Sequence, residues 1–194
     1  MGLQNKNVLL VDNEDSFTYN LIQLLENLNL NIDVVNGKKA FEEKFLQYTY
    51  LLFSPGPGIP SDFPLMFNLL ENYQEHQRIL GICLGHQAIG EFFGGKLVKL
   101  DRVLHGIRSE CELLKKNNRS CLRHIENRFT VGHYHSWAID ANFLPNSLEI
   151  TCLSENTIMG IMHKEYQIEG LQFHPESIMT KRGVEMIRSW IGAT

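Results

Sequence analysis

Residues 78–93 read RILGICLGHQAIGEFF, and the prediction of the fold starts from the turn in their middle. The apolar run before Cys83 is typical of a buried strand, and residues 84–93 are typical of a helix. Gly81 and Gly85 flank the cysteine and leave room for a tight elbow that holds its side chain in a strained, exposed position. At the start of a helix, the dipole favours thiolate over thiol. A lone cysteine is more simply a buried structural residue, but this context makes Cys83 a candidate nucleophile.

Apolar runs and helical periodicities alternate through the first half of the chain. Strands are predicted at 7–11, 32–35 and 50–53 and before Cys83, and helices at 17–28, 40–46, 63–73 and 84–93. Asp15 or Ser16 is expected to cap the first helix. Continuous apolar strands are typical of parallel strands covered on both faces. This order predicts a doubly wound, mostly parallel sheet with active groups at the carboxyl ends of its strands.

The second half predicts closely spaced strands with little helix between them. They are expected at 97–98, 110–114, 130–133, 148–153, 158–163 and 168–173. Glu155 and Asn156 suit a hairpin turn. A last helix at 182–191 would place Val184, Ile187 and Ile191 on one stripe. We therefore expect one domain over residues 1–194, a three-layer α/β fold whose parallel sheet gains antiparallel strands late in the chain.

The composition excludes several classes of function. The chain has 194 residues, of which 43% are hydrophobic, enough for a single sizeable core. Eighteen Lys and Arg against 22 Asp and Glu give a net charge of −4, so no nucleic-acid partner is expected. No apolar stretch approaches the ~18 residues that span a bilayer, and the N-terminus lacks the layout of a signal peptide. We expect a cytoplasmic protein without a membrane partner.

The cysteines and histidines do not predict a metal site. The four cysteines are Cys83, Cys111, Cys121 and Cys152. They show no close pairing in the sequence, which indicates free thiols in a reducing compartment. Among eight histidines, His133 and His135 form a pair, but no Cys-x-x-Cys or His-x-x-x-His accompanies it.

A second motif is GLQFHPES at residues 170–177. A strand ending at Phe173 would place His174 at the same edge of the sheet as Cys83. A neutral imidazole there can accept the thiol proton and later return it to a leaving amine. Glu176 can accept a hydrogen bond from the other ring nitrogen and hold the tautomer. Alone, these are more simply a capping histidine and a solvated carboxylate, but with the cysteine elbow they predict a Cys–His–Glu triad.

A third motif, Ser54-Pro55-Gly56-Pro57-Gly58, directly follows the predicted strand at 50–53. Many such runs are no more than a rigid turn. At the end of a neighbouring parallel strand, however, the run would bring a backbone N–H towards the reacting carbon. Gly58 would then share an oxyanion hole with the N–H of Leu84. Loss of one such donor typically costs about 2.7–4 kcal/mol of transition-state stabilisation.

Together the segments 54–58, 81–87 and 173–177 resemble class I, triad-type glutamine amidotransferases, and the resemblance spans residues 8–178. It implies that Cys83 is the nucleophile, His174 the base and Glu176 its orienter. Thiol attack on the side-chain amide of L-glutamine would give a γ-glutamyl thioester and ammonia, and water would then release glutamate. The resemblance implies no metal and no cofactor.

The same resemblance implies a glutamine pocket. Gln87 matches the position that contacts the amino-acid end of the substrate. The remaining pocket positions are Gly56, Pro57, Gly58, Ser136 and Trp137.

The opening VDNEDSFTYNL, residues 11–21, resembles amidotransferase subunits that serve chorismate-using synthases, and HYHSW at 133–137 fits the same group. The implied partner is a separate synthase subunit, component I, which uses the ammonia to form anthranilate or 4-amino-4-deoxychorismate. Some subunits of this type serve both routes, and the resemblance favours anthranilate. Glu14, Trp137 and Ile107-Arg108 depart from the usual pattern, the last in a region expected to meet the partner.

Two other functions remain open from the sequence. A stand-alone hydrolase, for example one acting on γ-glutamyl peptides, would need no partner chain, and we would expect an altered segment 56–58 or an altered Gln87. A regulatory subunit with an inactive site would be expected to lack part of the Cys–His–Glu set. Neither alteration is present.

Overall fold

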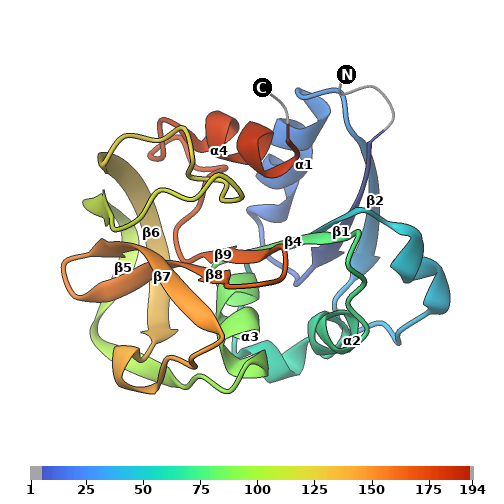
Figure 1. The fold of residues 1–194 in the computed structure, drawn as a ribbon, viewed down its shortest axis with the longest axis horizontal. Helices are drawn as coiled ribbons and strands as arrows, with labels where there is room; N and C mark the ends of the chain where they lie inside the picture. Colours follow the sequence, from blue (N-terminus) through green and yellow to red (C-terminus); the bar gives the residue numbers. More distant parts are fainter. Residues whose placement is uncertain (1–5, 193–194) are drawn as a thin grey trace.

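The structure is a computed structural model that describes residues 6–192, without the side chains of residues 101–104. Within this range nine strands form one sheet (Figure 1). The strands are β1 (Asn7–Asp12), β2 (Asn31–Asn36), β3 (Tyr50–Phe53), β4 (Arg78–Ile82), β5 (Leu97–Leu113), β6 (Arg128–Ile139), β7 (Leu148–Ser154), β8 (Thr157–His163) and β9 (Ile168–Leu171). The α-helices are α1 (Thr18–Glu26), α2 (Leu65–Glu71), α3 (Leu84–Phe92) and α4 (Gly183–Trp190), and the 3-10 helices are η1 (Glu43–Gln47), η2 (Pro60–Asp62) and η3 (Ala141–Phe143).

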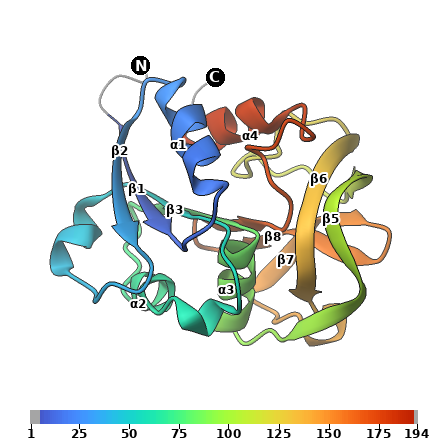
Figure 2. The same ribbon diagram turned by 180° about the vertical axis from the view of Figure 1, so that it is seen from behind.

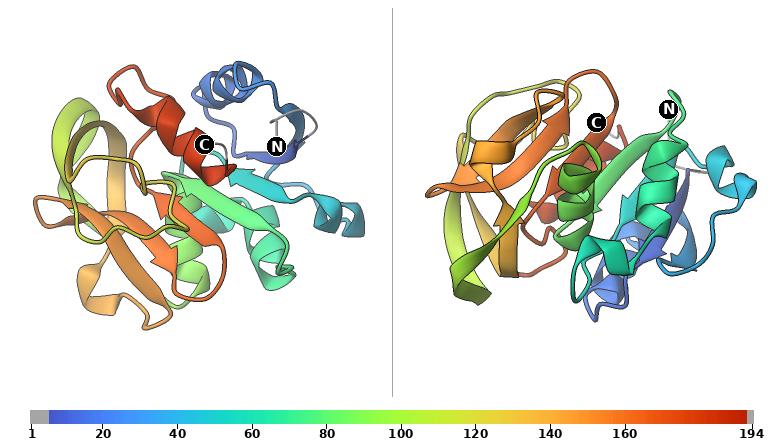
Figure 3. Two further views of the ribbon diagram at one scale, coloured as in Figure 1. Left: turned by 45° about the horizontal axis from the view of Figure 1, so that its top comes forward. Right: turned by 90° about the horizontal axis from the view of Figure 1, so that it is seen from below.

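The order of the strands is β2-β1-β3-β4-β9-β8-β7-β5-β6. The pairs from β2 to β9 are parallel, and those from β9 to β6 are antiparallel. Figure 3 shows β5 to β8 gathered on one side of the molecule, away from β1 and β2. This architecture confirms the predicted α/β class, with antiparallel strands added late in the chain.

Helices cover both faces of the parallel part of the sheet. Figures 1 and 2 show α1 and α4 on one face and α2 and α3 on the other. Strand β1 serves both layers, because Val8 and Leu10 pack into the core beneath α1 and α4, whereas Leu9 and Val11 pack into the core beneath α2 and α3. Burial on both faces explains why these strands read as continuous apolar runs.

The prediction was wrong about the length of two strands. Strand β5 runs unbroken through Leu97–Leu113, where two short strands were expected, and β6 covers Arg128–Ile139. Their pairing contains register shifts between Lys99 and Leu104 and between His105 and Ile107. A half-exposed ribbon with such irregularities breaks the alternation of apolar and polar residues that sequence analysis depends on.

The ends of two helices also differ from expectation. Helix α1 begins at Thr18, and neither Asp15 nor Ser16 caps it. The Asp15 carboxylate instead accepts from the Phe17 N–H at 2.7 Å, so it stabilises a turn before the helix. In α4 the predicted apolar stripe is incomplete, because Val184 is 46% exposed at its first turn. The expected helix at 40–46 is only the short 3-10 helix η1.

Among residues 6–192, no helix has both the length and the apolar character needed to cross a bilayer. Residues 1–5, on which the expectation about a signal peptide partly depends, lie outside the described residues.

Candidate active site

Cys83 lies at the elbow between β4 and α3. Its φ of 51° and ψ of −98° place it in a region that residues other than glycine seldom adopt. A Cβ on Gly85 would lie 2.6 Å from the Cβ and 2.7 Å from the carbonyl oxygen of Phe53, and one on Gly81 would lie 2.4 Å from the Gly85 carbonyl. The two glycines are therefore required by the close approach of the helix start to the sheet.

His174 and Glu176 follow β9, which pairs in parallel with β4. Ile82 lies opposite Leu171, so the two strands end at the same edge. His174 Nδ1 and Glu176 Oε1 are 2.7 Å apart, and only 2% and 0% of these two side chains are exposed. The structure thus brings the three residues of the predicted triad to one edge of the sheet, as sequence analysis expected.

The neighbours of His174 determine its charge. Burial lowers its pKa, but the Glu176 carboxylate and the Cys83 thiol outweigh burial and raise the pKa to about 10. Nδ1 is held by the carboxylate, whereas buried Nε2 has no hydrogen-bond partner among the described residues. Nε2 is therefore the ring nitrogen free to exchange a proton with the sulfur or with a bound substrate.

Two aromatic rings enclose the imidazole. The Phe17 and Tyr134 ring centroids lie 5.0 and 4.9 Å from that of His174, both tilted edge to face, and 4.7 Å from each other. They restrict the ring and exclude water from it. Both residues belong to the segments 11–21 and 133–137 quoted for the resemblance, but sequence analysis assigned them no role.

The loop at 54–58 is anchored to the end of β1. The Asn13 N–H donates to Ser54 Oγ at 2.9 Å, and Asn13 Nδ2 donates to the Ser54 carbonyl at 2.8 Å. A Cβ on Gly56 would lie 2.5 Å from Leu84 Cδ2, so this loop packs directly on the first residue of α3. Gly58 has φ of +72°, which glycine adopts without strain.

The first turn of α3 leaves backbone donors free. Its first intrahelical hydrogen bond runs from the Gln87 N–H to the Cys83 carbonyl at 3.0 Å. The N–H of Leu84 therefore has no acceptor within the helix. Together with the loop at 54–58, this geometry suits a site that binds a negatively charged oxygen beside the sulfur.

The predicted pocket residue Gln87 links α3 to β6. Its Nε2 lies 3.0 Å from the carbonyl oxygen of Trp137 and 3.1 Å from Gln172 Oε1. Gln172 Nε2 in turn lies 3.5 Å from Cys83 Sγ. Ser136 is half-buried beside Trp137 in β6. The contact of Gln172 with the sulfur was missed, although the residue lies within the quoted motif at 170–177.

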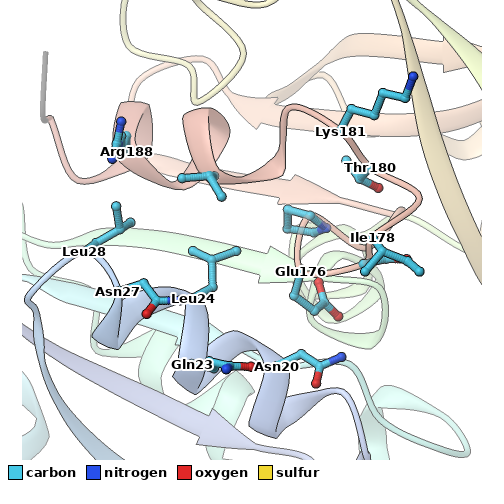
Figure 4. Close-up of a pocket in the computed structure, with 13 residues that line it drawn as sticks. Asn20, Gln23, Leu24, Asn27, Leu28, Glu176, Ile178, Thr180, Lys181 and Arg188 are labelled. Carbon is cyan, nitrogen blue, oxygen red and sulfur yellow. The ribbon is translucent and has the colours of Figure 1, made fainter.

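A cavity of about 480 Å³ lies between α1, α4 and the loop that follows β9 (Figure 4). Glu176 and Ile178 line it from the loop, and Asn20 lines it from α1. Cys83 and Gln87 are not among its lining residues. The cavity therefore borders the carboxylate of the site but is distinct from the expected glutamine pocket.

Comparison with known proteins places the chain in a family. Residues 9–192 match the family described as "Glutamine amidotransferase class-I". The anthranilate synthase component 2 of Cyanophora paradoxa is 40% identical over 188 residues, covering 95% of this chain and 97% of that protein. The aminodeoxychorismate/anthranilate synthase component 2 of Bacillus subtilis is 36% identical over 187 residues, covering 95% of each. A solved structure from Thermoplasma acidophilum, described as a "putative gmp synthase subunit a protein", shares the fold with a TM-score of 0.85 at 24% identity, covering 96% of this chain and 92% of that one. The chain belongs to the class I glutamine amidotransferase family.

Proposed function

We propose that this chain, as one glutamine amidotransferase domain over residues 1–194, hydrolyses L-glutamine and delivers ammonia to a chorismate-aminating synthase subunit. The observation that carries the proposal is the buried His174–Glu176 pair, 2.7 Å apart, beside a cysteine on a strained elbow. This arrangement supports a triad in which Cys83 is the nucleophile, His174 the base and Glu176 its orienter.

In the first half of the reaction, the Cys83 thiol gives its proton to His174 Nε2, and the sulfur of the resulting thiolate–imidazolium pair attacks the side-chain amide carbon of L-glutamine. A C–S bond forms, and the carbonyl oxygen becomes an oxyanion that accepts hydrogen bonds from the N–H groups of Gly58 and Leu84. His174 then gives its Nε2 proton to the amide nitrogen. The C–N bond breaks, ammonia leaves, and a γ-glutamyl thioester remains on Cys83.

In the second half, water hydrolyses the thioester. Neutral His174 accepts a proton from the water through Nε2 while the oxygen bonds to the carbonyl carbon. The C–S bond then breaks, glutamate leaves, and the thiolate–imidazolium pair is restored. Glu176 holds Nδ1 throughout and stabilises the positive charge of the ring, which agrees with its raising of the His174 pKa.

The substrate's amino-acid end is bound from α3 and β6. Both hydrogens of Gln87 Nε2 are used by Trp137 and Gln172. Its Oε1 is therefore available to accept a hydrogen bond from the substrate ammonium. The remaining pocket residues are Gly56, Pro57, Gly58, Ser136 and Trp137.

The proposed partner is a separate synthase subunit, and exposed side chains beside the site support it. Ile178 is 90% exposed and Tyr19 is 77% exposed, and Asn20, next to Tyr19, lines the same cavity as Ile178. Large apolar side chains left exposed close together on a surface are typical of an interaction surface. The names of the relatives, component 2, support the same assignment.

We propose that the product of the complex is anthranilate. The Cyanophora relative, at 40% identity, is named for anthranilate synthase alone. The Bacillus relative, at 36%, is named for both anthranilate and aminodeoxychorismate synthases. The alternatives are a chain that serves the folate route and a chain that serves both routes. Identifying the aminated product or products distinguishes these three possibilities.

For the test, the chain is purified together with its bound synthase partner, and chorismate is supplied with either glutamine or an ammonium salt. We expect anthranilate from both nitrogen sources. Cys83→Ala should lower glutamine-dependent synthesis on the order of 10⁶-fold, the scale seen when a triad nucleophile is removed. Ammonium-dependent synthesis should be unchanged, which shows that the synthase partner remains active, and co-purification of Cys83→Ala with the partner shows that the complex remains assembled.

Three outcomes would overturn parts of this proposal. If the Cys83→Ala complex still uses glutamine, the proposed mechanism is wrong. Full turnover of glutamine or of γ-glutamyl peptides by the chain alone, with no synthase partner bound, indicates a stand-alone hydrolase. Absence of Cys83 labelling by a glutamine-like electrophile, or labelling that glutamine does not block, indicates a regulatory subunit with an inactive site.

A further inference from the structure

Gln172 is a fully buried polar residue to which the proposed chemistry assigns no role. It directly follows β9, two residues before His174, and its backbone N–H donates to the Met159 carbonyl at 2.9 Å. Its side-chain Nε2 lies 3.5 Å from Cys83 Sγ. The backbone of Gln172 is thus fixed by the sheet, and its amide is directed at the nucleophilic sulfur.

An amide can present either its nitrogen or its oxygen to the sulfur, and the neighbours of Gln172 decide which. The Trp137 carbonyl oxygen only accepts, so the atom of Gln87 that lies 3.0 Å from it is the NH₂ group. The same NH₂ group lies 3.1 Å from the Gln172 amide, which must offer its oxygen there. The NH₂ group of Gln172 therefore faces Cys83 Sγ as a donor.

The Trp137 carbonyl is itself held by a line of hydrogen-bonded side chains. His135 Nδ1 lies 2.8 Å from it, and His133 Nδ1 lies 3.1 Å from His135 Nε2. His133 Nε2 is hydrogen-bonded to Ser109 Oγ. Ser109 Oγ in turn lies 2.7 Å from Ser154 Oγ. The line connects strands β5, β6 and β7 to the elbow of α3.

The direction of the hydrogen bonds in this line follows from the neutral state of its histidines. Burial, with a smaller effect from the nearby His174, lowers the pKa of His133 and of His135 to about 4. Because the Trp137 carbonyl accepts, His135 Nδ1 carries the proton and Nε2 accepts from His133. His133 Nε2 then accepts from the Ser109 hydroxyl. Each of these donors points towards Trp137.

This line is not a path for protons. It ends on a backbone carbonyl, and the two glutamine amides beyond it do not exchange protons with their neighbours as acids or bases do. The line of hydrogen bonds instead fixes the orientation of side chains. The Trp137 carbonyl holds the Gln87 amide in place, and the Gln87 amide holds the Gln172 amide.

We propose that Gln172 is a further catalytic residue, whose side-chain N–H donates to the Cys83 sulfur and stabilises the thiolate before attack and during thioester breakdown. Gln87 and the Trp137 carbonyl, anchored by His135, position it. The inference deepens the proposed function and rests on it. Because the contact is made to the sulfur and not to the substrate, its loss lowers kcat and leaves the KM for glutamine unchanged.

The test compares Gln172→Met, which keeps the volume and removes the donor, with Gln172→Glu, which places a carboxylate against the thiolate. We measure the rate of Cys83 alkylation by iodoacetamide at one neutral pH, and kcat and KM for glutamine in the complex with the synthase partner. Gln172→Met should lower the alkylation rate and kcat by about 10- to 100-fold, the scale of a hydrogen bond to a charged group. Gln172→Glu should lower both further, since like charges repel.

Gln77→Met is the matched control. Gln77 is also fully buried and hydrogen-bonded, to the Leu46 and Tyr48 carbonyls, but none of its hydrogen bonds is to a residue of the active site. We expect wild-type alkylation and kcat from it. Co-purification of each variant with the synthase partner shows that it folds and docks, and if Gln172→Met does not fold, the isosteric Gln172→Glu carries the test.

The inference is overturned if folded Gln172 variants alkylate within twofold of wild type, or if only KM changes. Failure of the proposed function gives a different pattern. The wild-type complex would then not use glutamine at all, while the iodoacetamide comparison would still report the contact between Gln172 and the sulfur.

Discussion

Cys83 combines a reactive side chain with a backbone conformation that costs about 1–3 kcal/mol in residues other than glycine. Local contacts hold it there: its N–H donates to the Leu171 carbonyl at 2.8 Å, and its carbonyl accepts from the Gln87 N–H at 3.0 Å. The first contact ties the elbow to β9 and the second begins α3. The strain therefore fixes where the sulfur lies relative to His174, which follows the same strand.

The His174–Glu176 pair predicts how stability depends on pH. The folded-state pKa of His174, about 10, lies above its ordinary value of 6.5, so the folded protein binds this proton more tightly than the unfolded chain does. The resulting stabilisation is complete below pH 6.5 and is lost as the pH rises towards 10. Glu176→Gln removes the charge that raises this pKa most. Between pH 6.5 and pH 10, the free energy of unfolding of Glu176→Gln should therefore fall less than that of wild type.

The measurement is urea unfolding of wild type and Glu176→Gln at intervals between pH 6.5 and pH 10. Glu26→Gln, which removes an exposed carboxylate on the surface of α1, should follow the wild-type curve and serves as the control. Parallel curves for wild type and Glu176→Gln would show that the carboxylate does not hold the imidazolium.

At the scale of elements, the fit of α3 against β3 can be tested with two glycines of the same helix. A Cβ on Gly85 would lie 2.6–3.1 Å from Phe53 Cβ and backbone atoms, whereas one on Gly90 would meet the flexible end of Ile139, 2.4 Å from its Cδ1. The backbone of Phe53 cannot move away from an added Cβ as easily as the end of the Ile139 side chain can. We expect Gly85→Ala to lower the free energy of unfolding by about 2–3 kcal/mol.

Gly90→Ala should stay within about 1 kcal/mol of wild type, because rotation of Ile139 relieves the clash and alanine favours the helix interior. Urea unfolding of both variants checks the difference. Gly85→Ala should also slow alkylation of Cys83 by moving the elbow, and Gly90→Ala should not. Equal losses of stability in the two variants would contradict a backbone contact at Gly85.

The elements that the sequence predicted well are those whose burial is uniform along the chain. A continuous apolar run predicts β3 at Tyr50–Phe53, and all four residues are buried. The two glycines that predict the elbow are those that the helix–sheet contact requires. The long β5 could not be found, because its pairing with β6 is irregular and half exposed. The sequence of a single strand does not show which other strand it pairs with or where that pairing is irregular.

The candidate site divides in the same way. Cys83, His174 and Glu176 follow strand ends within recognisable motifs, so sequence analysis could name them and place them at one edge. Gln172, Phe17 and Tyr134 act through contacts between segments far apart in the chain. A glutamine or a tyrosine has no spacing that predicts such a contact, and only the folded structure shows it.

At the scale of the whole molecule, the site lies where the two kinds of sheet meet. Strand β9 pairs in parallel with β4 and in antiparallel fashion with β8. Cys83 comes from the parallel half, His174 and Glu176 follow the strand at the boundary, and Trp137 comes from the antiparallel half. Loss of packing between the halves would therefore separate Cys83 and His174 from Trp137, while the parallel pair of β4 and β9 keeps Cys83 and His174 together.

The face beside this boundary carries the last prediction. Figure 4 shows Ile178 on the loop after β9, close to Glu176 and to Asn20 of α1. Because Ile178 and Tyr19 are 90% and 77% exposed, burying them against the proposed synthase partner would remove apolar surface from water. Ile178→Asp and Tyr19→Asp should each raise the dissociation constant of the complex by about 10-fold or more, the effect of losing 1.4 kcal/mol.

Val34→Asp is the matched control, since Val34 is 51% exposed on β2, at the far edge of the sheet in the strand order. Its complex should form as in wild type. Binding is measured by titrating the synthase partner onto each immobilised variant, and the rate of Cys83 alkylation should be the same in all of them, because none of the three side chains contacts the sulfur. Wild-type affinity of both Ile178→Asp and Tyr19→Asp would place the interface elsewhere, and the ammonia would then have to leave the site by another face.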